Sequence, residues 1–98
     1  MSRARFLPSA ETEFLAEIAF YASAGQGIGV RFQAAVELTL TTALEHPYSG
    51  VPGRRSTRHL PIKGFPFFLV YRLDGDELLV VALAHQSRRP DYWRTRLK

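Results

Sequence analysis

Two apolar runs joined by a short polar turn constrain the fold of this chain more than any other feature of its sequence. Residues 65–73 are apolar at nearly every position, residues 78–84 are apolar throughout, and Asp74-Gly75-Asp76 lies between them. Runs of this length that are rich in aromatic and β-branched side chains are typical of strands covered on both faces. A glycine between two aspartates favours a tight turn. The two runs are therefore predicted to form an antiparallel hairpin at the centre of a sheet.

Helical spacing dominates the half of the chain that precedes these runs. Apolar side chains recur at helical intervals between Ala10 and Ala22, which predicts an amphipathic helix over residues 9–24 with Ser9 as its N-cap. A second apolar stripe begins at Ile28 and predicts a helix that ends before Pro47. The glycine-rich turn between the stripes would join the two helices into an αα-hairpin.

The remaining segments are predicted to be short strands, a loop and a tail. Residues 3–7 alternate weakly and end at a proline, which predicts a strand at or near a sheet edge. Residues 47–56 have the proline, glycine and serine content of a surface loop, and residues 57–63 alternate as a strand does. In the tail, Pro90 is well placed to open a last helical turn.

This order predicts an α+β fold in one domain that spans residues 1–98. An N-terminal strand, an αα-hairpin and a three-stranded antiparallel meander follow one another, with the helices packed on one face of a four-stranded sheet. Because the helices can cover only one face, the other must face solvent or be covered by the tail or by a partner chain.

Several classes of function are excluded or disfavoured by composition. The chain has no cysteine, which excludes disulfides, cysteine-ligated zinc and thiol nucleophiles. The longest apolar run, at 78–84, is far shorter than the roughly 20 residues of a membrane helix, and no signal peptide is evident, so we expect a cytoplasmic protein. The three histidines have no metal-ligand spacing, and the Gly-x-Gly-x-Gly turn lacks the nucleotide-binding spacing. We expect no metal, no cofactor and no membrane association.

The positive charge is concentrated in the second half of the chain. Residues 50–98 carry ten Lys and Arg side chains against four Asp and Glu, a net +6, whereas residues 1–49 carry three against five, a net −2. Such an asymmetry points to an anionic partner, either a nucleic acid or an acidic protein segment.

The tail carries the most suggestive cluster, in which Tyr92 and Trp93 are interleaved with Arg88, Arg89, Arg94 and Arg96. Arg and aromatic side chains dominate protein interfaces and also stack on nucleic-acid bases. The alternative is that one of the rings packs on the sheet, and for Trp93 packing is the preferred interpretation.

Other candidate residues each have a structural alternative. His85 could act as a general base, or it could be a strand-end histidine whose ring nitrogens bond to the backbone. Arg54, Arg55 and Arg58 could contact phosphate together with Lys63, or they could be solvated charges beside a strand edge. Glu13 and Glu17, on the first predicted helix, are interpreted as a solvated acidic face.

Two segments resemble the ParE branch of the ParE/RelE toxins of type II toxin–antitoxin systems. They are Phe-Pro-Phe-Phe-Leu-Val-Tyr-Arg at 65–72 and His-Gln-Ser-Arg-Arg-Pro-Asp-Tyr-Trp at 85–93. The resemblance extends to Pro8 and Ala10, Tyr21, Gly29 and Phe32, and Pro47, Gly50 and Pro52. It implies a small α+β toxin fold, and a cognate antitoxin that binds the toxin in a hetero-oligomeric complex and neutralises it.

The resemblance leaves the target of the toxin open. ParE-like members inhibit DNA gyrase by binding, and this would make Arg88, Arg89, Tyr92 and Trp93 the target-binding residues. RelE-like members cleave mRNA on the ribosome, and this endoribonuclease alternative would use His85 or Tyr92 as the base, with Arg58, Lys63 and Arg88 on phosphate. We favour the non-enzymatic gyrase inhibitor, because the strand and tail are ParE-like and the chain lacks a convincing acid–base pair. The endoribonuclease alternative is weakened but not excluded, because the residue six positions before Tyr92 is Gln86 where RelE-like members carry Arg. Ser87 and Arg89 depart from the ParE-like segment, and a degenerate toxin that only binds its antitoxin is a third alternative.

Overall fold

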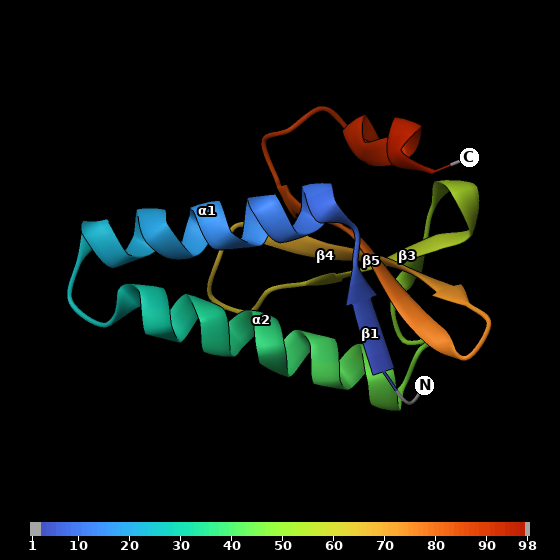
Figure 1. Cartoon of the computed structure of the whole chain (residues 1–98), viewed down its shortest axis with the longest axis horizontal. Helices are drawn as coiled ribbons and strands as arrows, with labels where there is room; N and C mark the ends of the chain where they lie inside the picture. Colours follow the sequence, from blue (N-terminus) through green and yellow to red (C-terminus); the bar gives the residue numbers. More distant parts are fainter. Residues whose placement is uncertain (1–2, 98) are drawn as a thin grey trace.

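Two helices pack on one face of a mixed five-stranded sheet in the computed structural model, which describes residues 3–97 (Figure 1). The sheet order is β1-β5-β4-β3-β2, with β1 parallel to β5 and every other pair antiparallel. The elements are β1 (Arg3–Phe6), α1 (Pro8–Ala24), α2 (Ile28–Glu45), β2 (Val51–Pro52), η1 (Arg54–Ser56), β3 (Thr57–Pro61), β4 (Phe67–Asp74), β5 (Glu77–His85) and η2 (Tyr92–Arg96). The α+β class, the αα-hairpin, the antiparallel meander and the edge position of the first strand are confirmed.

Several details differ from the sequence-based predictions. The last helical turn, η2, begins at Tyr92 with Asp91 as its N-cap, so Pro90 does not open it. The sheet has five strands because Val51 and Pro52, within the predicted loop, pair with β3 as the short edge strand β2. Helix α1 begins at Pro8, with Leu7 as an N-cap that makes no side-chain capping bond, so Ser9 lies inside the first turn. Proline suits this first helical position, because an N–H there would have no helical partner and proline carries no N–H. Strand β3 ends at Pro61 and does not reach Lys63.

The helix hairpin depends on two glycines at its turn. Gly27 adopts a left-handed φ of 77° immediately before α2, a conformation that favours glycine. A Cβ on Gly29 would lie 3.0 Å from the Cβ of Ala22, so the absence of a side chain lets the two helices approach closely. Figure 1 shows the hairpin tip projecting away from the sheet.

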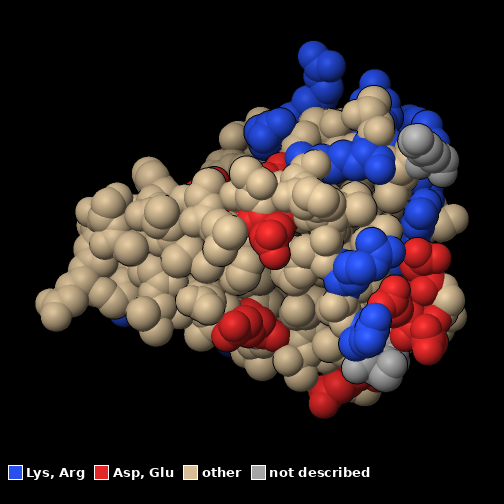
Figure 2. Space-filling view, viewed as in Figure 1, with Lys and Arg blue, Asp and Glu red and all other residues tan. Residues whose placement is uncertain are grey.

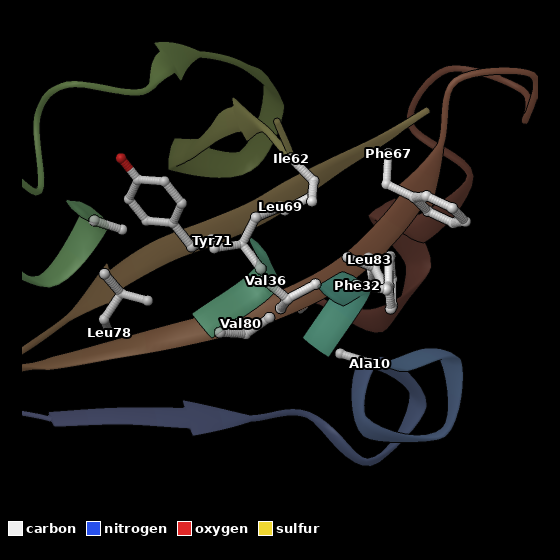
Figure 3. Close-up of a cluster of buried hydrophobic side chains, with 11 residues drawn as sticks. Ala10, Phe32, Val36, Ile62, Phe67, Leu69, Tyr71, Leu78, Val80 and Leu83 are labelled. Carbon is white, nitrogen blue, oxygen red and sulfur yellow. The ribbon is translucent and has the colours of Figure 1, made fainter. Parts of the chain in front are cut away.

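The main core lies between the helices and the sheet. Figure 3 shows Phe32 and Val36 of α2 close to Leu69 of β4 and to Val80 and Leu83 of β5. All five side chains are at most 3% exposed. Burial of this many large apolar side chains is the principal stabilising contribution to the fold.

A second cluster covers the outer face of the sheet, which the helices do not reach. Trp93 and Leu97 of the C-terminal segment pack there against Val70 of β4 and against β5. A β-bulge at Val81 lets consecutive side chains of β5, Val81 and Ala82, join this cluster. The outer face was expected to meet solvent, the tail or a partner chain, and over β5 it is the tail that covers it.

Candidate functional site

The edge of β5 beyond Val80 is capped by side chains. Strand β1 pairs with β5 only as far as Phe6, which lies opposite Val80. Further along, the Leu83 N–H donates to Oε1 of Glu13 at 3.2 Å, and the Val81 carbonyl accepts from Nη1 of Arg96 at 3.0 Å. These bonds supply partners to backbone groups that would otherwise be unpaired at the strand edge.

The capping side chains also bind one another, and we call Glu13, Tyr92 and Arg96 the Glu13 clamp. Oε2 of Glu13 accepts a 2.6 Å hydrogen bond from the Tyr92 hydroxyl. Arg96 donates from both terminal nitrogens to the same carboxylate, at 2.9 Å and 2.8 Å. The Arg96 and Glu13 side chains are only 19% and 18% exposed, so this bidentate ion pair is shielded from water.

Burial and bonding act in opposite directions on the Glu13 carboxyl. Burial raises its pKa, but the hydrogen bonds from Arg96 and Tyr92 outweigh burial and hold the pKa below the ordinary value. The Tyr92 hydroxyl shows the reverse result, because burial and its bond to the Glu13 carboxylate together raise its pKa well above the ordinary value. Tyr92 therefore keeps its proton at neutral pH.

Two guanidinium groups contact the Tyr92 ring. The Cζ atom of Arg88 lies 3.8 Å from the ring centroid and that of Arg96 lies 5.2 Å from it. Both contacts are within the range of cation–π attraction. Through this ring the exposed Arg88 is connected to the partly buried Glu13 clamp.

A shallow pocket of about 220 Å³ lies on the outer face of the sheet beside the C-terminal segment. Phe68 and Val70 of β4 contribute apolar side chains to its lining. Arg88 and Arg89 also line it and are exposed, whereas Trp93 is 6% exposed. Trp93 thus packs on the sheet, as preferred from the sequence, and the four tail residues expected to bind a target meet at this C-terminal pocket.

Positive charge gathers near the same end of the molecule. Figure 2 shows most of the blue side chains over the sheet and the C-terminal segment, whereas the projecting end of the helix hairpin is nearly uncharged. Arg54 of η1 is joined to this region by an ion pair, in which its Nε lies 2.9 Å from Oδ2 of Asp91. That exposed ion pair links the loop before β3 to the tail.

His85 ends β5 at the rim of the pocket. Its Nδ1 accepts a 3.0 Å bond from the Ser87 N–H, and its ring packs edge-on against Phe67 at 5.0 Å. Because a backbone N–H can only donate, Nδ1 is the acceptor in this bond. One ring nitrogen of His85 is therefore bonded to the backbone, as the strand-end interpretation expected.

Arg58 and Lys63 are not brought to this pocket. Arg58 donates to the carbonyls of Tyr48 and Gly50, at 3.1 Å and 2.9 Å, and lines a separate hollow that includes Tyr48 and Arg72. Lys63 is exposed beyond the end of β3. Of the three basic residues named for RNA cleavage, only Arg88 lines the C-terminal pocket, whereas Arg58 and Lys63 lie away from it.

Glu13 was not predicted to be part of the site, and Arg96 was predicted only as one of the arginines of the tail cluster. Glu13 was interpreted as a solvated carboxylate, and this is wrong because it binds Leu83, Tyr92 and Arg96. Its place beside Phe14, at the border of the apolar stripe, was the available signal. No local pattern could identify Arg96 as its partner, since the two residues are 83 positions apart.

Residues 3–97 contain no group of three His, Cys, Asp or Glu side chains placed to hold a metal ion. Within the same described range, no helix combines the length and the apolar character needed to cross a bilayer.

Comparison with known proteins assigns the family. The family described as the ParE toxin of type II toxin–antitoxin systems, parDE, matches residues 4–90. The chain belongs to the ParE toxin family. A Sinorhizobium fredii relative named "Putative toxin Y4kP" is 40% identical to this ParE-family chain over 59 residues, a match that spans 58% of this chain and 62% of the relative. The solved structure of a chromosomal ParDE toxin–antitoxin system from P. aeruginosa shares the ParE fold, with a TM-score of 0.73 at 16% identity, over 87% of this chain and 95% of that one.

Proposed function

We propose that this ParE-family toxin inhibits DNA gyrase in the cytoplasm by binding it, without catalysis, through the C-terminal pocket. The observation that carries the proposal is the composition of that pocket. Exposed Arg88 and Arg89 stand beside an apolar lining that includes Phe68 and Trp93. An apolar recess flanked by arginines suits a protein surface that presents an apolar side chain among acidic residues.

The bonding of the titratable groups supports binding over proton transfer. The Tyr92 hydroxyl donates a hydrogen bond to Glu13 and has a raised pKa, so the ionised form that could act as a base is scarce at neutral pH. Nδ1 of His85 already accepts from Ser87. The Tyr92 hydroxyl and Nδ1 of His85 thus each already have a hydrogen-bond partner within the chain.

A cognate antitoxin is the second partner that we propose. The solved relative comes from a ParDE toxin–antitoxin system, and this chain belongs to the same family of toxins. The net +6 of residues 50–98 would attract an acidic antitoxin segment and accelerate formation of a hetero-oligomeric complex.

A supercoiling assay with purified chain and purified gyrase tests the proposal. We expect the chain to inhibit supercoiling, and Arg88→Ala combined with Arg89→Ala to raise the inhibitory concentration about ten-fold or more. Arg31→Ala, a substitution of an exposed arginine on α2, is the matched control and should leave inhibition unchanged.

Two other outcomes would overturn the proposal. If transcripts are cleaved on ribosomes while gyrase remains active, the chain is an endoribonuclease. If soluble chain expressed without antitoxin neither inhibits gyrase nor arrests growth, it is a degenerate toxin that only binds its antitoxin.

A further inference from the structure

We infer that Glu13 of α1 is a positioning residue that orients the C-terminal pocket residues for their target, an inference that rests on the proposed function. Glu13 does not line the pocket. It contacts Tyr92 and Arg96 of η2, and Tyr92 does line the pocket. Its effect on the target would therefore be exerted through these two side chains.

The polar contacts of Glu13 join three elements at one carboxylate. The carboxylate belongs to α1, accepts from the Leu83 backbone of β5, and accepts from Tyr92 and Arg96 of η2. Arg96 also donates to the Val81 carbonyl, so η2 is bonded to the strand as well as to the helix. Directional hydrogen bonds of this kind determine orientation more strictly than apolar contact does.

The other contacts of the tail do not provide the same orientation. Trp93 and Leu97 attach it to the sheet by apolar packing, which is non-directional. The Arg54 to Asp91 ion pair holds the preceding residues, but Arg54 is 74% exposed and such pairs contribute little. Within residues 3–97, the shielded polar contacts between η2 and the rest of the fold are those of the Glu13 clamp together with the bond from Arg96 to the Val81 carbonyl.

The clamp is linked to the target-contacting surface by the Tyr92 ring. The hydroxyl of this ring is bonded to Glu13, and the guanidinium of Arg88 lies 3.8 Å from its centroid. If the Tyr92 ring turned, the Arg88 guanidinium that stacks on it would have to move as well. We therefore expect loss of the Glu13 carboxylate to displace Arg88 while Trp93 and Leu97 keep the tail on the sheet.

The test compares Glu13→Gln with Glu11→Gln, a matched substitution of an exposed carboxylate on the same helix. Growth arrest on induction and inhibition of purified gyrase measure function. Emission from Trp93, the single tryptophan, and alkaline absorbance titration of the tyrosines report on the tail. We expect Glu13→Gln to raise the inhibitory concentration about ten-fold, with a tyrosine that ionises at lower pH than in the parent. Glu11→Gln should change neither.

Tyr92→Phe is the second variant, because it removes the hydroxyl and keeps the ring that Arg88 contacts. If the clamp acts as a unit, Glu13→Gln and Tyr92→Phe together should weaken inhibition by less than the product of their separate effects. Circular dichroism should show each variant folded.

The outcomes separate this inference from the proposed function. If the parent chain inhibits gyrase and a folded Glu13→Gln chain inhibits equally, the inference is overturned and the proposed function stands. If the parent arrests growth without inhibiting gyrase, the proposed function falls, and an equal growth arrest by Glu13→Gln would overturn the positioning role as well. A parent chain with no toxicity overturns both.

Discussion

At the scale of single residues, Tyr71 shows how one hydroxyl orders a loop. Its side chain is fully buried, and its hydroxyl donates to the Pro47 carbonyl at 2.9 Å and accepts from the Gly50 N–H at 3.1 Å. Tyr71→Phe should lower the free energy of unfolding by about 1–3 kcal/mol, because both backbone groups lose their partner. Urea denaturation measures this, and Tyr48→Phe, at a 71% exposed ring, is the control that should have little effect. Equal stability of the two variants would contradict the prediction.

Glu13 gives a prediction for acid stability. Its folded-state pKa is lowered, so its contribution to stability is complete above the unfolded-state pKa and is lost as pH falls through the folded-state value. Glu13→Gln should therefore reduce stability by about 2 kcal/mol at pH 7 and by progressively less in acid. Thermal melts of the parent and of Glu13→Gln, from pH 7 down into acid, measure the difference in stability between them. A difference that stays constant with pH would contradict the assignment of the shift to this carboxyl.

At the scale of elements, the C-terminal segment acts as the cover of the outer sheet face. Removing residues 92–98 would expose the outer side chains of β4 and β5, including Val70, Leu79 and Val81, which are now at most 4% exposed. We expect the shortened chain to bind a hydrophobic dye and to aggregate. Arg94→Ala, an exposed position in η2, should leave the chain monodisperse in light scattering. A shortened chain that stays monodisperse and binds no dye would show that the segment is not needed as a cover.

The elements differ in how far the sequence could predict them. Helices α1 and α2 and strands β4 and β5 were predictable because each carries its own hydrophobic period or a continuous apolar run. Strand β2 was not, because two residues carry no period and Val51 and Pro52 become a strand only by pairing with β3. Within the candidate site, Arg88 to Trp93 could be grouped because they are close in the chain, whereas Phe68 joins them through strand pairing.

At the scale of the whole molecule, the separation of a highly charged end from a nearly uncharged hairpin tip leads to a prediction about salt. Binding that depends on Arg88 and Arg89 should weaken as ionic strength rises, because exposed charges are screened beyond about 8 Å at physiological salt. Reversing both charges, Arg88→Glu with Arg89→Glu, should abolish binding to gyrase in calorimetric titrations. Arg31→Glu on α2 serves as the charge-matched control. Binding that is insensitive to salt would place the interaction on another surface.

The sequence by itself determined the α+β class, the order of elements and the location of the basic residues, because these follow from local periodicity and composition. Only the tertiary structure decided what covers the second face of the sheet and what Glu13 does. Glu13 meets Leu83 and Arg96 across 70 and 83 positions of chain, and these contacts exist only when α1, β5 and the tail are packed together. A carboxylate on a helix has the same local pattern whether it faces water or an arginine. Its surroundings are set by the packing of distant elements, so the local pattern can place Glu13 at the border of the apolar stripe but cannot identify its partners.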